Sequence, residues 1–123
     1  MTVTLYGIAN CDTVRKARGW LQAMNIDYAF HDYKKSGIGE DKLRRWVARA
    51  GWEKILNRAG TTFRKLAEAD KAGLDGDRAV RIMLAHNSAI KRPIIEYSGA
   101  AGDGLLVGFD EPGWSAALAG AAT

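Results

Sequence analysis

The chain has 123 residues, 47% hydrophobic and 26% charged, which is the balance of a globular domain with a core of ordinary size. No apolar run approaches the roughly 18 residues of a membrane-spanning helix, and no signal-peptide pattern opens the sequence, so we expect no membrane association. The single cysteine excludes an internal disulfide and a cysteine-based metal cluster, and it favours a reducing, cytoplasmic compartment.

The net charge of +4 is concentrated in the middle of the chain. Residues 34–65 contain ten Lys or Arg against three acidic residues. Such a stretch can attract nucleic acid, but no aromatic stripe interleaves with these charges as a stacking platform requires. A solvated basic helix face gives the same pattern, so nucleic acid is not an expected partner.

The first part of the chain predicts a strand, a helix and a second strand. The strands are expected at 3–7 and 28–33, and the helix at 12–24. Apolar residues recur along one face of this helix, at Val14, Ala17, Leu21 and Met24. The β-α-β order indicates two parallel strands joined by a right-handed crossover.

A helical block follows, at about residues 40–87. Its predicted helical segments lie at about 43–50, 52–57, 63–66 and 78–86. We expect Thr61 or Thr62 to cap the third segment and Asp77 to cap the last, because short polar side chains are favoured at helix starts.

The last part predicts an antiparallel hairpin and a short helix. Pro93 directly precedes a strand at 94–97, a position where its missing N–H is tolerated. A second strand at 105–109 follows a Gly-rich turn, and a helix is expected around 114–118. The order β-α-β, helical block, β-β-α predicts one α/β domain over residues 1–123, with a four-stranded mixed sheet and a helical insertion.

Cys11 lies between the first predicted strand and helix. Free backbone N–H groups at a helix start stabilise an anion, and a thiolate is such an anion. Arg15, Lys16 and Arg18 follow within two turns and are expected to lower the Cys11 pKa further, against the opposing charge of Asp12. A free cysteine is often a buried packing residue instead. The polar residues around Cys11 suit an exposed turn, which favours the reactive thiol.

The order and spacing of several short motifs resemble the arsenate-reductase-like family of thioredoxin-fold proteins, closest to its YffB-type branch. The matching motifs are Leu5-Tyr6-Gly7-Ile8, Asn10-Cys11-Asp12-Thr13, Asp27-Tyr28, His31-Asp32-Tyr33, Gly51-Trp52-Glu53, Gly60-Thr61-Thr62-Phe63-Arg64-Lys65-Leu66, Ile90-Lys91-Arg92-Pro93 and Leu105-Leu106-Val107-Gly108-Phe109. They cover nearly the whole chain.

This resemblance implies a thioredoxin-like sheet and a cis peptide bond before Pro93. It implies Cys11 as the attacking thiolate, with glutathione or a glutaredoxin as the electron donor and no bound cofactor or metal. It also implies a basic anion site. Arg92 matches one oxyanion-binding arginine of the arsenate reductases, Arg15 matches the arginine four positions after the nucleophile, and Arg58 matches a further one approximately.

Other family positions differ in this chain. Arsenate reductases have a His four positions before the nucleophile, where this sequence has Gly7. No basic residue occupies the position of their third oxyanion arginine, near Val107-Gly108. Spx-type regulators often have a second cysteine where this chain has Val14, so a two-cysteine redox switch is excluded.

The leading hypothesis is a monothiol reductase, an oxidoreductase in which Cys11 attacks a disulfide or an oxidised small molecule. An external thiol must then resolve the adduct, because no second cysteine exists. Arg92 is expected to bind the anionic part of the substrate, with Arg15, Arg58 and Asn10 as further candidates. Two alternatives stay open. One is glutaredoxin-dependent arsenate reduction through a Cys11–arsenate adduct, and the other is a regulator that binds RNA polymerase, which is not favoured.

Overall fold

The computed structural model describes residues 1–100 and 102–121. The chain divides into two compact units. One consists of Met1–Ser36 together with the segment from Arg92 onward, and the other is Gly37–Lys91. None of the helices in the described ranges has the length and hydropathy needed to cross a membrane.

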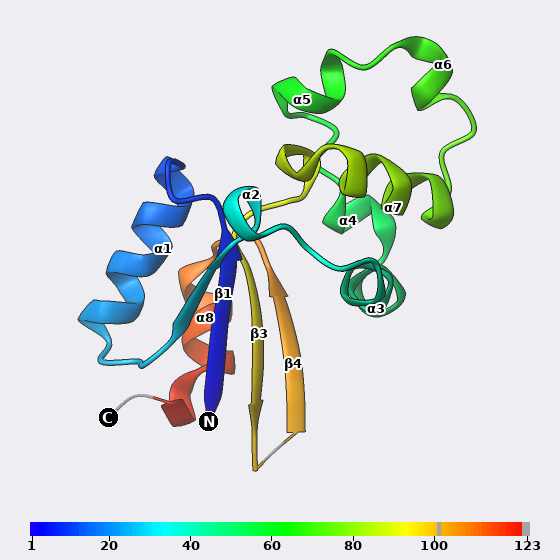
Figure 1. Ribbon diagram of the computed structural model, residues 1–123. Coiled ribbons are helices and arrows are strands. Elements are labelled where there is room, and N and C mark those ends of the chain that lie inside the picture. The colour runs from blue at the N-terminus through cyan, green and yellow to red at the C-terminus, as the bar shows by residue number, and fades with distance from the viewer. Residues whose placement is uncertain (101, 122–123) are drawn as a thin grey trace. The chain divides into compact units, whose positions relative to one another are not determined.

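The first unit is built on the predicted four-stranded mixed sheet, whose strand order is β2-β1-β3-β4 (Figure 1). The strands are β1 (Thr2–Gly7), β2 (Ala29–Asp32), β3 (Ile94–Gly99) and β4 (Gly102–Val107). β1 is parallel to β2 and antiparallel to β3, which forms an antiparallel pair with β4. The hairpin turn is shorter than predicted, and its residue 101 lies outside the described ranges.

Helix α1 (Asp12–Ala23) makes the crossover between β1 and β2, as predicted. Its buried residues Val14, Ala17 and Leu21 recur at helical spacing and face the sheet. Asn25, at φ 57, takes the left-handed conformation directly after the helix, which Asn tolerates better than most residues. The chain is thereby turned back toward β2.

The core of this unit lies between the sheet and two helices, α1 and α8 (Glu111–Ala117). Its fully buried members are Val3, Leu5, Val14, Ala17, Leu21, Ile26, Ile95, Trp114 and Leu118. Trp114 is 1% exposed, and its indole N–H donates to the carbonyl of Gly108 at 2.9 Å. Asp110 caps α8, because its carboxylate accepts from the N–H of Gly113 at 3.1 Å.

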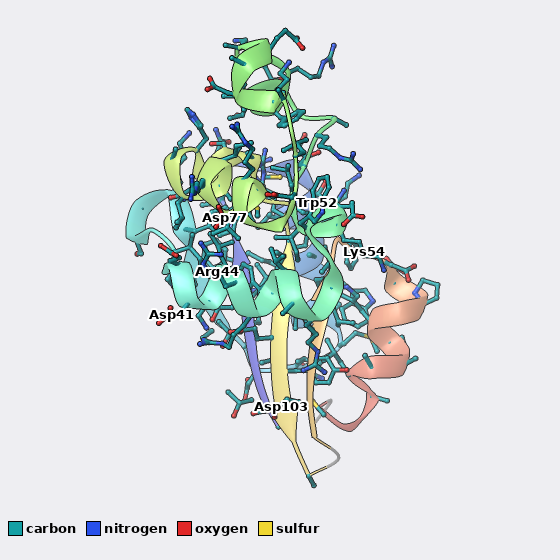
Figure 2. All side chains as sticks on the ribbon, turned by 90° about the vertical axis from the view of Figure 1, so that its right-hand side faces the viewer. Asp41, Arg44, Trp52, Lys54, Asp77 and Asp103 are labelled. Carbon is teal, nitrogen blue, oxygen red and sulfur yellow. The ribbon has the colours of Figure 1, made fainter. Side chains whose placement is uncertain are left out.

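The second unit is helical and contains the insertion expected at about 40–87. Its helices are α3 (Glu40–Ala50), α4 (Trp52–Ile55), α5 (Thr61–Arg64), α6 (Glu68–Lys71), α7 (Gly76–Ala85) and the 3-10 turn η1 (Asn87–Ala89). Arg44 of α3 points to Asp77 of α7, 3.0 Å away (Figure 2). Leu56, directly after α4, forms an isolated antiparallel bridge with Ile90 and so joins this segment to the end of the second unit.

Helix starts in the second unit differ from the prediction. Asp75, and not Asp77, caps α7, because its carboxylate accepts from the N–H of Arg78 at 2.8 Å. Gly60 precedes α5 without a side-chain cap, although Thr61 or Thr62 was expected there. Sequence analysis also missed α6, a single turn with no buried residue and therefore no apolar pattern.

The second strand ends earlier than predicted, and α2 (Tyr33–Ser36) follows where a loop was expected. Asp32 causes this change. Its Oδ1 accepts from the N–H groups of Lys34 at 3.0 Å and Lys35 at 3.3 Å, which caps the first turn of α2. Tyr33 thus becomes the first residue of a helix and is completely buried.

The Arg92–Pro93 peptide bond is cis, as the family resemblance implied. Pro93 directly precedes β3, and its carbonyl accepts from the N–H of Gly108 at 2.8 Å. Arg92 is therefore fixed at the start of β3.

Gly7, the last residue of β1, packs closely against α1. A Cβ added at Gly7 would lie 2.8 Å from Cγ2 of Val14, a branched side chain that is itself fully buried. We expect Gly7→Ala to lower the free energy of unfolding by about 1–3 kcal/mol through overpacking. In a Val14→Ala background the added methyl has room, so the penalty of Gly7→Ala should shrink. Urea unfolding of the four proteins measures this coupling, and equal penalties in both backgrounds would contradict the packing.

Candidate functional site

Three segments of the first unit meet at one end of its sheet. Gly7 at the end of β1 pairs with Asp32 at the end of the parallel strand β2. Since β3 is antiparallel, its first residue Ile94 pairs with Tyr6 at the same end. The loop after β1, the start of α2 and the residue before Pro93 therefore converge (Figure 1). These segments contain Cys11, Tyr33 and Arg92.

Cys11 is the N-cap residue of α1, as predicted, and is half-buried. Its extended backbone leads into the helix, and its carbonyl accepts the first helical bond from the N–H of Arg15 at 2.9 Å. The Cys11 side chain makes no cap hydrogen bond to the helix start, but the N–H groups of Val14 and Thr13 lie close enough to the sulfur to favour a thiolate. The helix start thus presents its free donors to Cys11.

The guanidinium of Arg92 lies close enough to the Cys11 sulfur for its donors and its charge to favour the thiolate. Partial burial on its own raises the pKa of Cys11. This is outweighed by the Val14 N–H, by the donors and charge of Arg92, and by the Thr13 N–H, so the pKa is lowered. The direction agrees with the sequence prediction. The cation responsible was predicted among the residues after Cys11, whereas the structure identifies Arg92, which is distant in sequence.

Arg15 and Arg18, two of the three basic residues of α1, have partners elsewhere. Arg15 contacts the carboxylate of Asp12 and donates to Oδ1 of Asn10 at 2.7 Å, at the exposed rim of the Cys11 loop. Arg18 donates to the phenol oxygen of Tyr28 at 2.9 Å and lies over the ring of Phe30. The expectation that Arg18 helps to lower the Cys11 pKa stays a prediction. Arg15 and Asn10 remain candidates for binding a substrate at the rim.

Arg58 belongs to the second unit. Its guanidinium lies 5.2 Å from the ring centre of Trp52, the residue labelled on α4 in Figure 2. This cation–π contact gives Arg58 a structural partner within its own unit. Its predicted role in anion binding stays a prediction.

Tyr33 is a site residue that sequence analysis missed. Its side chain is completely buried, and its phenol lies close enough to the Arg92 guanidinium for that group's donors and charge to act on it. Burial raises the pKa of Tyr33 far above its usual range, and the thiolate form of Cys11 and the carboxylate of Asp32 add to this, although Arg92 opposes it. Tyr33 therefore stays a neutral phenol. It belongs to the matched motif His31-Asp32-Tyr33, but its place in a predicted strand gave no reason to assign it a role.

Asp32 joins the Cys11 loop to α2. Besides capping α2, its carboxylate accepts from the N–H of Ala9 at 3.2 Å, two residues before Cys11. Burial on its own raises the pKa of Asp32, but the N–H groups of Ala9, Lys35 and Lys34 and the charge of Lys35 lower it. Asp32 is thus an ionised tether for the loop. The sequence pattern that could have indicated this role is a polar residue directly before a helix. It was not recognised, because α2 is too short to be predicted as a helix.

The close packing around Gly7 explains why no histidine stands at this position. The position where arsenate reductases have their histidine is buried here, and Val14 fills the space that its side chain would need. Among the described residues no group of three or more His, Cys, Asp or Glu could hold a metal ion. The groups that the structure brings together around the sulfur are the Cys11 thiolate, the Arg92 guanidinium and the neutral phenol of Tyr33.

The chain is similar to several known proteins. The model of the ArsC family matches residues 6–117. The solved structure of the YFFB protein is 53% identical with a TM-score of 0.88, over 95% of this chain and 99% of that one. The structure of an arsenate reductase (ArsC) related protein from Brucella melitensis is 49% identical with a TM-score of 0.73, over 94% and 93% of the two chains. The global transcriptional regulator Spx of Streptococcus pyogenes is 30% identical, over 76% of this chain and 70% of its own.

The first test of the site concerns Cys11 and its cation. We expect the rate of alkylation by neutral iodoacetamide to rise with pH at a lower midpoint than in the urea-unfolded chain, because Arg92 and the helix start favour the thiolate. Arg92→Ala should raise that midpoint and slow the reaction at neutral pH by about three- to tenfold. Arg15→Ala is the matched control and should leave the midpoint nearly unchanged. A larger shift for Arg15→Ala than for Arg92→Ala would contradict the assignment.

A second test concerns the Asp32 tether. Asp32→Asn keeps one acceptor oxygen but loses the charge, so we expect the free energy of unfolding at neutral pH to fall by about 1 kcal/mol. Because the pKa of Asp32 is lowered in the fold, this stabilisation is present above its unfolded pKa of roughly 3.9 and disappears as pH falls through the folded value. Thermal unfolding of both proteins from neutral to acidic pH should show the difference shrinking. A constant difference would mean that the charge plays no part.

Proposed function

Because the chain belongs to the ArsC family, with its thioredoxin-like fold, we propose that it is a monothiol reductase coupled to glutathione or a glutaredoxin. The observation that supports this most is the contact between Arg92 and the half-buried sulfur of Cys11. A lowered thiol pKa and an adjacent guanidinium are what attack on an anionic disulfide requires. Such a thiol stays active in a reducing, cytoplasmic compartment, which we include in the proposal.

The proposed cycle has two exchange steps. In the first, the Cys11 thiolate attacks the glutathione sulfur of a mixed disulfide. The new Cys11–glutathione bond forms as the old disulfide bond breaks, and the substrate leaves as a thiolate that takes a proton from water. In the second, the thiolate of free glutathione or of a glutaredoxin attacks the glutathione sulfur on Cys11 and releases the Cys11 thiolate. The two electrons thus come from the external thiol, as a chain with one cysteine requires.

Arg92 has two roles in this cycle. In the free protein its charge stabilises the Cys11 thiolate. Once Cys11 is in a disulfide its charge is gone, and the guanidinium becomes available to a carboxylate of the bound glutathione. A guanidinium can donate to a carboxylate through two parallel hydrogen bonds, which orients the ligand as well as attracting it.

Arsenate reduction is the second candidate. The family model and the arsenate reductase related structure from Brucella melitensis support it. Against it, the histidine position is Gly7 and cannot accept a side chain without moving Val14, and the sequence has no basic residue at or next to Val107-Gly108. Arsenate-dependent oxidation of NADPH in an assay coupled through glutathione and glutaredoxin would establish this activity.

Regulation through RNA polymerase is the candidate from another class, and the similarity to Spx supports it. The position of a second cysteine holds Val14, which is buried in the core of the first unit. Copurification of the chain with RNA polymerase would favour this candidate over both enzymes.

The proposal predicts a reversible adduct on Cys11. Oxidised glutathione should add one glutathione to the folded protein and reduced glutathione should remove it, as followed by intact mass. Arg92→Lys should slow adduct formation by at least about tenfold, since the bidentate geometry of a charged hydrogen bond is worth roughly 1.4 kcal/mol or more. The same variant should react almost normally with iodoacetamide, because lysine retains the positive charge.

Three outcomes would count against the proposal. A Cys11 that reacts only in the unfolded chain is a packing cysteine. Equal losses for both reagents in Arg92→Lys mean that Arg92 acts on the thiolate alone. No loss for either reagent means that Arg92 has no part in the site.

A further inference from the structure

Tyr33 lies beside Arg92, the cation that favours the Cys11 thiolate, and its own side chain has no exposed surface. We infer that Tyr33 is a positioning residue, whose phenol holds the Arg92 guanidinium against Cys11 and so sets the reactivity of the thiol. The effect on the thiol follows from the geometry of the site, and the consequence for anionic substrates rests on the proposed function.

The backbone of Tyr33 is fixed from both sides. It is the first residue of α2, and Asp32 directly before it caps that helix and also binds the N–H of Ala9. Because the same carboxylate anchors α2 and the Cys11 loop, the distance between Tyr33 and the loop has little freedom. The phenol therefore offers Arg92 a fixed partner, unlike a side chain on a surface loop.

The direction of a hydrogen bond between Tyr33 and Arg92 follows from the two groups. A guanidinium has donors only, so the phenol oxygen of Tyr33 accepts from Arg92. Arginine has a long side chain with many rotamers, and a second fixed partner limits it to orientations that also reach the sulfur. A buried phenol oxygen needs a hydrogen-bond partner, so the contact satisfies both groups.

Neutrality of the phenol is part of this role. Burial and the nearby negative charges keep Tyr33 protonated, since they raise its pKa far above the usual range. A phenolate here would compete with the Cys11 thiolate for Arg92, and its negative charge would repel the thiolate. Tyr33 thus orients the guanidinium without neutralising it.

Charged groups on the neighbouring elements have partners of their own. From neighbouring elements, Asp32 binds the loop and α2 through backbone N–H groups, and Lys35 acts on Asp32. On the Cys11 helix itself, Asp12 and Arg15 contact each other. Tyr33, in contrast, has its phenol beside the Arg92 guanidinium.

The test is Tyr33→Phe in the full-length protein, which removes the oxygen and keeps the ring. We expect the pH midpoint of iodoacetamide alkylation at Cys11 to rise, with about a threefold loss of rate below the midpoint, since a shift of half a pH unit changes the thiolate fraction by that factor. In an Arg92→Ala background the same change should leave the midpoint where Arg92→Ala alone puts it. Tyr28→Phe is the matched control. It removes a phenol that accepts from Arg18 at 2.9 Å, and it should leave the midpoint unchanged.

The outcomes separate the inference from the proposed function. A Tyr33→Phe protein that is less stable but has the wild-type midpoint would make Tyr33 a structural residue and overturn the inference. An equal shift with and without Arg92 would overturn it too, because Tyr33 would then act on the sulfur directly. A wild-type midpoint equal to that of the unfolded chain would instead contradict the proposed function. Should Tyr33→Phe fail to fold, fluorotyrosine placed at position 33 alone weakens the phenol oxygen as an acceptor, and an unchanged midpoint would then overturn the inference.

Discussion

The interaction of the Arg92 guanidinium with the Cys11 thiolate is the one on which this site depends. Sheet topology makes it possible. A parallel pair and an antiparallel pair share β1, so the end of β1, the end of β2 and the start of β3 lie together. Residues far apart in the sequence therefore meet at a single sulfur. If the register of β3 slipped by one residue, Arg92 would face away from Cys11.

The energetics of the thiol are a balance of opposing effects. Partial burial favours the neutral thiol, whereas the helix start and Arg92 favour the thiolate. Full exposure would weaken the effect of Arg92 through solvent screening, and full burial would prevent the thiol from reaching a substrate. A half-buried cysteine at a helix N-cap, beside a half-buried guanidinium, has both a stabilised charge and access to a disulfide.

Much of this fold follows from the sequence. The apolar spacing of Val14, Ala17 and Leu21 predicted α1, and the order of elements predicted the mixed sheet. The position of Cys11 at a helix start followed from the same reasoning. Arg92 did not, because no local pattern indicates that a residue before β3 will lie beside a residue after β1. Its assignment, like the cis bond before Pro93, came from the resemblance to a known family.

The missed features share a physical cause. Helices of one turn, such as α2 and α6, are too short to show a periodic apolar face, and a cap such as Asp32 is recognised only when the helix after it is known. Tyr33 was therefore placed in a strand, although in the structure it begins α2 beside Arg92. The choice between Asp75 and Asp77 as the cap of α7 failed for a similar reason, since both are good caps and Gly76 between them gave no indication of the boundary.

The most direct test of the account uses the mixed disulfide of glutathione and 2-mercaptoethanol. Glutathione has the more acidic thiol and is the better leaving group, so an undirected thiolate would retain mercaptoethanol and release glutathione. The account predicts the opposite, because Arg92 binds the anionic half of the disulfide next to Cys11. Intact mass of the protein after a single turnover should show glutathione on Cys11. Retention of mercaptoethanol, or equal retention of both halves, would contradict anion-directed attack by Cys11.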